Sequence, residues 1–126
     1  MAEKIKLVRG DTKPQIKCTI LDDISSEPQN IAGANVLLKF RAAGTAAILF
    51  SMPGYLMNGL EAADGTLNTS GIYATAGTGG RVVFEFVAGN LDLPAGPYEG
   101  ELEVTFADSS VQTVYAPIKF SIREQF

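Results

Sequence analysis

Glycine and proline interrupt this chain so often that long helices have little room to form. The 126 residues include 13 Gly and 6 Pro, and these break nearly every window long enough for three helical turns. Between them, apolar and polar residues alternate with a period of two, which is the pattern of a strand that buries one face. The sequence therefore predicts an all-β chain.

The strictest alternation lies between residues 98 and 106. Its inward positions are Tyr98, Gly100, Leu102, Val104 and Phe106. Its outward positions are Glu99, Glu101, Glu103 and Thr105. Residues 107–110 supply turn chemistry, and residues 111–123 are expected to return as one long strand. The inward positions of that strand are Ala116, Ile118, Phe120 and Ile122.

Four other segments show strand patterns, at residues 4–8, 14–21, 35–41 and 81–87. Their expected inward residues include Ile16, Cys18, Ile20, Val36, Leu38, Phe40, Val82, Phe84 and Phe86. The segment 81–87 is apolar on both sides, because Val83 and Val87 share its outer face with Glu85. We expect this strand to be central or to be covered by a partner, so Val83 and Val87 are candidate interface residues.

The middle of the chain, residues 42–80, is rich in Gly, Ala, Ser and Thr and holds only weaker strand candidates, at 47–52 and 71–75. Residues 22–33 form a polar connection. Several short strands at this spacing, with no helix long enough to connect parallel strands, are typical of a sandwich. We therefore predict one domain, residues 1–126, folded as an antiparallel immunoglobulin-like β-sandwich of about seven or eight strands.

Residues 93–98 read Leu-Pro-Ala-Gly-Pro-Tyr and place Gly96 and Tyr98 at the entry of the penultimate strand. Immunoglobulin-like domains have a Tyr there whose hydroxyl bonds to upstream backbone, the tyrosine corner. The disulfide and Trp of antibody domains are absent, because the chain has one Cys and no Trp. Cys18 is interpreted as a small buried hydrophobic residue, and a reactive thiol is the alternative.

The lack of histidine narrows the possible chemistry. With no His and a single Cys, the chain cannot form an internal disulfide, a His/Cys metal site or an imidazole-based triad. We predict no catalytic residues, no metal site and no cofactor, and hence no enzyme.

Charge and hydropathy also limit the partners. The formal charge of −4 is spread along the chain, and no two Lys or Arg residues are adjacent, so binding to nucleic acid is disfavoured. No apolar run approaches the ~20 residues of a membrane helix, so membrane insertion is not expected. Residues 1–4 lead into a strand pattern rather than a signal peptide. The chain is expected to stay in the cytosol or to be assembled there into something larger.

Two motifs admit both a functional and a structural interpretation. Glu99, Glu101 and Glu103 lie on one strand face about 7 Å apart. This face could bind calcium or a basic partner, or it could be a solvated face neutralised by Lys39, Arg41 or Lys119 on neighbouring strands. Arg9-Gly10-Asp11 spells the integrin-recognition tripeptide, but Gly-Asp is also ordinary turn chemistry.

Other binding chemistry has weaker support. Residues 76–80 are glycine-rich but lack the Lys-Ser/Thr and the helix of a phosphate loop, so they are interpreted as a flexible turn. A carbohydrate-binding face would use exposed aromatic residues, for which Tyr55, Tyr73 and Tyr115 are the candidates. Nothing in the spacing of the aspartates marks a glycosidase pair.

Six short motifs, taken in order, suggest a known family. They are Lys6–Thr12, Asp22-Asp23, Ile31–Val36, Gly80–Phe84, Leu93–Glu101 and Ala116–Ile122. Over nearly the whole chain this order resembles the N-terminal domain family of phage upper-baseplate proteins. The resemblance implies an immunoglobulin-like sandwich that holds tail, baseplate or fibre parts together in the virion, after assembly in the bacterial cytoplasm. In that family the domain often precedes a receptor-binding or oligomerising segment.

Two functional hypotheses follow. The first is a non-enzymatic phage or prophage structural protein of the tail or baseplate, which contacts other virion proteins and forms homo-oligomers. Its candidate interface residues are Val83, Val87, Glu99, Glu101 and Glu103. The second is an adhesin-like or carbohydrate-binding sandwich module, which would use the tyrosines.

Overall fold

The computed structural model describes residues 5–22, 24–114 and 117–125. The strands of the main sheet are β1 (Ile5–Val8), β2 (Gln15–Thr19), β3 (Asn35–Ala42), β4 (Phe50–Leu56), β7 (Arg81–Glu85), β8 (Gly96–Thr105), β9 (Val111–Thr113) and β10 (Ile118–Arg123). A small second sheet pairs β5 (Leu60–Glu61) with β6 (Leu67–Asn68). The described residues contain one helical element, the 3₁₀ turn η1 (Gly71–Tyr73), and no helix that could cross a bilayer.

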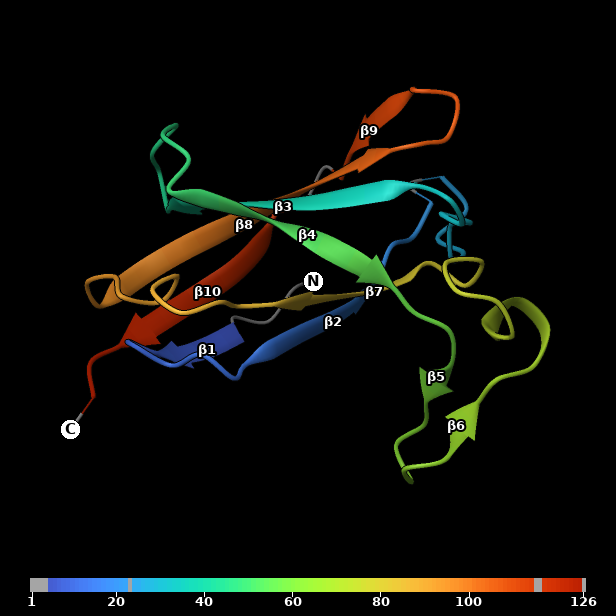
Figure 1. The fold of residues 1–126 in the computed structure, drawn as a ribbon, viewed down its shortest axis with the longest axis horizontal. Helices are drawn as coiled ribbons and strands as arrows, with labels where there is room; N and C mark the ends of the chain where they lie inside the picture. The colour runs from blue at the N-terminus through green and yellow to red at the C-terminus, as the bar shows by residue number, and fades with distance from the viewer. Residues whose placement is uncertain (1–4, 23, 115–116, 126) are drawn as a thin grey trace.

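The main sheet curls into the two layers of a sandwich (Figure 1). The strand order is β1-β10-β8-β3-β4-β7-β2, with β9 attached to β8. The start of β4 belongs to the layer of β3, β8, β10 and β1, whereas its end belongs to the layer of β7 and β2. Between described strands, only β1 and β10 pair in parallel. Strands β2, β3, β7, β8 and β10 take the places of strands B, C, E, F and G, so the fold is an immunoglobulin-like β-sandwich.

Strand β4 changes layer at Pro53-Gly54. It pairs with β3 as far as Gly54, opposite Val36, and it pairs with β7 from Tyr55 onward. Pro53 lies opposite Leu37 but has no N–H to donate, so it cannot make all the hydrogen bonds of a regular strand residue. A Cβ on Gly54 would lie 2.5 Å from Val82 Cγ2. Only glycine therefore lets the strand come this close to the second layer as it crosses.

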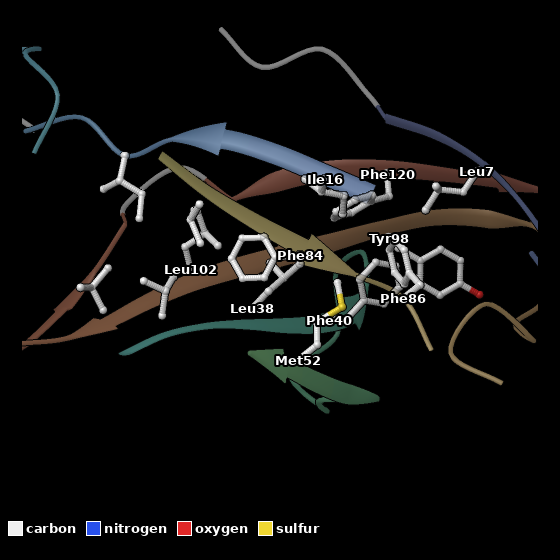
Figure 2. Packing of buried hydrophobic residues seen from close by; sticks show 14 of the residues in the cluster. Leu7, Ile16, Leu38, Phe40, Met52, Phe84, Phe86, Tyr98, Leu102 and Phe120 are labelled. Atoms are coloured by element: carbon white, nitrogen blue, oxygen red, sulfur yellow. The ribbon is translucent and has the colours of Figure 1, made fainter. Parts of the chain in front are cut away.

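Phe40 lies at the centre of the core between the layers and is fully buried (Figure 2). Its ring stacks on Phe50 at 4.8 Å and on Tyr98 at 5.4 Å between centroids. Phe120 contacts the same ring at 4.9 Å. Because these rings come from β3, β4, β8 and β10, aromatic contacts connect four neighbouring strands of the sheet.

The strand faces predicted for residues 35–41, 81–87 and 98–106 are confirmed. The buried residues on these faces are Val36, Leu38, Phe40, Val82, Phe84, Phe86, Tyr98, Gly100, Leu102 and Val104. Strand β7 lies between β4 and β2, so it is central in its layer, as the apolar residues on both sides suggested. The predicted all-β sandwich is likewise confirmed.

The strand predictions for residues 42–80 are wrong in two places. The candidate at 47–52 is displaced, because β4 begins at Phe50 and continues through Pro53-Gly54 to Leu56. The candidate at 71–75 is the 3₁₀ turn η1 and not a strand. Gly71, at φ 62, starts that turn in a backbone conformation that favours glycine.

The long final strand predicted for residues 111–123 is two strands. Val114 donates its N–H to Leu102 O at 2.9 Å, whereas Ile118 lies opposite Gly100. The register relative to β8 therefore shifts by two residues between β9 and β10. A shift of two keeps the same residues inward, so Phe120 and Ile122 are buried as predicted. Ala116 lies outside the described residues.

The connections between strands gather at the two ends of the sandwich (Figure 1). One end carries the β1–β2, β3–β4 and β7–β8 connections. The other end carries the β2–β3 connection, the long segment between β4 and β7, and the β8–β9 turn. This second end corresponds to the end of an immunoglobulin domain that carries the B–C and F–G loops.

Candidate functional site

The predicted corner at Tyr98 makes the hydrogen bond of a tyrosine corner. The Tyr98 hydroxyl donates to Pro94 O at 2.6 Å, and the side chain is 6% exposed. Gly96 begins β8 at φ 152, a conformation that side chains disfavour. Both residues hold the connection before β8 in place, and both have a structural role.

The glutamate ladder lies on the outer face of the first layer, where basic residues of β3 neutralise it. Lys39 Nζ lies 2.9 Å from Glu103 Oε2, and Arg41 Nη2 lies 3.3 Å from Glu99 Oε1. The bond to Glu103 also raises the pKa of Lys39. Glu101 lies opposite Lys39 in the strand register. These contacts favour the solvated-face interpretation.

Val83 and Val87 lie on the outer side of the second layer. Val83 is half-buried between its cross-strand neighbours Lys17 and Tyr55. Val87 follows the end of β7 and is 63% exposed. Tyr55 is exposed beside Val83. The structure therefore brings one predicted interface residue next to an exposed aromatic ring and leaves the other beyond the strand end.

The Arg9-Gly10-Asp11 turn is tied to the rest of the fold. The Arg9 guanidinium lies 3.1 Å from Asp92 and 3.2 Å from Glu124. Gly10 donates its N–H to Leu91 O at 2.9 Å. Because the arginine is held in ion pairs, these contacts favour turn chemistry over integrin recognition.

The candidate tyrosines for sugar binding do not form a row of exposed aromatic side chains among the described residues. Tyr73 belongs to η1, and its ring lies so close to Gly79 that a Cβ there would be 2.5 Å from Tyr73 Cδ1. Tyr55 lies on β4, and Tyr115 lies outside the described residues.

Cys18 packs against the core from β2. Burial raises the pKa of its thiol to about 11, and Arg81 lowers it to a lesser degree. The thiol is therefore protonated near neutral pH and is a poor nucleophile. Cys18 is partly buried, so it packs as a small hydrophobic residue as predicted but is less buried than expected.

The carboxylates with shifted pKa values are stabilised in their charged form. Hydrogen bonds from the Ser25 and Ile24 N–H groups hold the pKa of Asp22 below its usual value. Hydroxyl hydrogen bonds lower the pKa of Asp64 and Asp108 in the same way. A glycosidase acid needs a raised pKa instead. Within the described ranges, no three His, Cys, Asp or Glu side chains gather in a metal-binding arrangement.

Three chain segments, residues 20–34, 57–80 and 106–112, form one end of the sandwich, which we call the acidic end. Backbone hydrogen bonds join the first two, from Ile20 N to Gly80 O at 2.8 Å and from Ile31 N to Gly77 O at 2.9 Å. The first and third are joined by Gln29 Nε2, which donates to Gln112 Oε1 at 2.8 Å. Residues far apart in the sequence thus share one surface.

The acidic end differs in charge from the rest of the chain. Its three segments contain six of the 14 acidic residues and none of the ten Lys and Arg residues. Lys17 reaches it from β2 and lies 3.1 Å from Glu61. Arg81 also pairs with Glu61, at 3.1 Å. Charge that is spread along the chain is therefore unevenly distributed over the folded molecule.

Exposed aliphatic side chains also concentrate at the acidic end. Nine large hydrophobic residues of the described chain are exposed, and five of them lie here. These five are Leu21, Ile24, Leu67, Ile72 and Val111. Each of the three segments contributes at least one, so the acidic end is both apolar and negatively charged.

Ile24 is the most exposed of these residues, at 97%, and hydrogen bonds fix the loop around it. Asp22 Oδ1 accepts the N–H groups of Ile24 and Ser25 at 2.9 and 3.0 Å. Asp22 N donates to Glu27 O at 2.8 Å, which closes the loop. The loop therefore holds the isoleucine in solvent instead of folding it against the protein.

Sequence reasoning missed the acidic end because it assessed charge only along the chain. The absence of Lys and Arg from 20–34 and from 57–80 is visible in the sequence. That these two segments meet is not visible there, because it depends on which strands pair.

The chain matches no protein-family model and no curated protein. Among solved structures, it is similar to CopC from Methylosinus trichosporium OB3b, with a TM-score of 0.42 and 10% identity. The similarity covers 98% of this chain and 86% of CopC.

Proposed function

We propose that this chain is a non-enzymatic structural protein of a phage or prophage tail or baseplate, which acts through interfaces with other proteins. The order of its sequence motifs supports the tail or baseplate assignment. The immunoglobulin-like sandwich is the fold that this resemblance implies. Its partners are other virion proteins and further copies of itself, and its place is the virion.

The exposed aliphatic residues carry the protein-binding part of the proposal. A single exposed hydrophobic residue is common on soluble proteins, but several that share one surface mark an interaction site. The described chain buries its core well, since eight large side chains are less than 2% exposed. The exposed aliphatic residues therefore lie at particular places on the surface and do not reflect a loose core.

The alternative function, a carbohydrate-binding module, has less support. Sugar rings pack against exposed aromatic side chains, and Tyr55 is the one described tyrosine that is mostly exposed. A glycan array tests this alternative. A hit that is lost in Tyr55→Ala would replace the proposed function, whereas an array without hits removes the alternative.

Two measurements test the proposed function. Mass spectrometry of purified phage particles from cells that carry the gene is expected to find the chain among the virion proteins. Size-exclusion chromatography with light scattering is expected to show assemblies larger than one chain. A protein that is monomeric at high concentration and absent from particles would show the proposal to be wrong.

A further inference from the structure

The acidic end has the properties of a docking surface for one kind of partner. Residues of a docking surface need to be exposed, fixed in place before binding, and apolar at the centre. Ile24 meets these conditions, because it is 97% exposed on a loop closed by the hydrogen bonds of Asp22 and Glu27. An anchor that is already ordered loses little entropy when a partner covers it.

The size of the acidic end fits a standard interface. Such an interface uses roughly 20–30 residues of each partner. The three segments of the acidic end supply more than this, and hydrogen bonds join them. The β2–β3 connection, the segment between β4 and β7, and the β8–β9 turn lie at one end of the sandwich (Figure 1), and these segments contain Ile24, Ile72 and Val111. In immunoglobulin variable domains, loops at one end of the sandwich likewise form a binding surface.

Charge identifies the chemistry of the partner. The five described acidic residues of this surface face no Lys or Arg from within its own segments, and the nearby Lys17 and Arg81 both pair with Glu61. Complementary charge steers association and excludes wrong partners. A second copy presenting the same end would be repelled, so a basic surface is favoured.

We propose that the acidic end binds a different protein through a basic surface containing an apolar pocket, and that Ile24 is the anchor residue that enters the pocket. This inference rests on the proposed function, since it names the surface by which the chain joins its assembly. The opposite end has exposed residues too, at Ile48, Leu49 and Val87. However, Arg9 pairs there with Asp92 and Glu124, so charge of both signs is present.

Site-specific photo-crosslinking tests the location of the surface. A photoreactive amino acid replaces Ile24 or Val111 at the acidic end, and Ile48 or Leu49 at the opposite end as controls. The full chain is produced in cells that carry its gene, irradiated, and the crosslinked peptides are identified by mass spectrometry. Crosslinks from Ile24 and Val111 to Lys- or Arg-rich segments of one other protein are expected.

The outcomes separate this inference from the proposed function. Crosslinks from Ile48 or Leu49 alone would overturn the inference and leave a protein-binding function standing. Crosslinks from Ile24 to a second copy of the chain, or to segments without basic residues, would also overturn it. If no position crosslinks to any protein, both the inference and the proposed function fail.

The affinity between this chain and the purified partner that crosslinking identifies tests whether Ile24 is the anchor residue. Ile24→Ser is expected to weaken binding roughly tenfold or more, while Ile48→Ser leaves the affinity unchanged. Glu27→Lys is expected to slow association, and added salt to reduce the difference from the native chain. Glu101→Lys makes the same charge change on the sheet face and serves as its control. Unchanged affinity in Ile24→Ser, with an unchanged thermal midpoint, would rule out the anchor.

Discussion

The hydroxyl group of Tyr98 makes one hydrogen bond, to Pro94 O, in a nearly buried position. Removing it in Tyr98→Phe keeps the ring against Phe40 but leaves the Pro94 carbonyl without this donor. We expect the free energy of unfolding to fall by about 1 kcal/mol. Urea titration followed by circular dichroism measures this change. Tyr55→Phe, at an exposed ring, is the control, and an equal loss in both variants would contradict a special role for the corner.

Gly80 allows two segments of the acidic end to meet. Its φ is +75, and a Cβ there would lie 2.6 Å from Ile20 O and 3.0 Å from Gln29 O. Gly80→Ala is therefore expected to destabilise the fold by roughly 3 kcal/mol or more, from backbone strain and a clash with main-chain atoms.

The matched control for Gly80→Ala is Gly65→Ala. Gly65 has a φ of +88, and a Cβ at this position would meet nothing within 4 Å, so the variant tests backbone strain without a clash. We expect a loss of about 1–2 kcal/mol. Thermal unfolding of both variants compares the two costs, and similar midpoints would show that the contact at Gly80 matters little.

Single residues were predictable where a local rule applies. Tyr98 follows from a motif before a strand, and the outward glutamates follow from the alternation of β8. Ile31 was missed, although it is fully buried. It lies in a segment assigned as a polar connection, but it belongs to the buried core, and its N–H bonds to Gly77 in a distant segment.

At the level of elements, strands with regular alternation were predictable and strands that change partners were not. Any rule that uses only the local sequence predicts that a strand ends at Pro53-Gly54. In the structure they are the place where β4 leaves β3 and joins β7. The change of register between β9 and β10 was also not predicted, because both strands follow one alternating pattern of apolar and polar residues.

The β5–β6 segment is attached to the second layer through Glu61. Its carboxylate contacts Lys17 and Arg81 at 3.1 Å each, and Arg81 is only 9% exposed. Arg81 Nε is buried without a hydrogen-bond partner among the described residues. The guanidinium therefore depends on Glu61 and Thr19 for its contacts.

The Lys17 hydrogen bond lowers the pKa of Glu61 below the ordinary value of 4.5. A carboxylate with a lowered pKa stabilises the folded state fully above its unfolded value, and this contribution is lost as the pH falls through the folded value. We expect hydrogen exchange at Gly59, whose N–H bonds to Tyr73 O, to remain slow from neutral pH to about 5 after correction for the intrinsic rate. Protection should then fall as the pH drops below the ordinary value of 4.5.

Glu61→Gln removes the titrating group from this contact. Protection at Gly59 is expected to be lower than in the native chain at neutral pH, with less further loss on acidification. Glu85→Gln, on the same layer but bonded to Gln15, is the control. If Glu61→Gln behaves like the native chain at every pH, the ion pairs do not hold the segment.

At the scale of the whole molecule, folding separates charges that are mixed along the sequence. The three segments of the acidic end contain six of the 14 acidic residues and no Lys or Arg, and Lys17 and Arg81 reach this end from neighbouring strands to pair with Glu61. This arrangement could be predicted only in part, because the local absence of Lys and Arg is visible in the sequence whereas the meeting of the three segments depends on the topology. The charge separation also limits how copies of the chain can associate, since two acidic ends repel each other.

Self-association of this chain is therefore expected to leave the acidic end uncovered and to use the outer side of the second layer, near Tyr55 and Val87. Light scattering should give the same average mass for Ile24→Ser as for the native chain, at low and at high salt. Val87→Lys should lower the mass, because it places a charge on an apolar contact. A mass that falls in Ile24→Ser but not in Val87→Lys would mean that the acidic end joins copies of the chain, and that charge repulsion does not decide how they assemble.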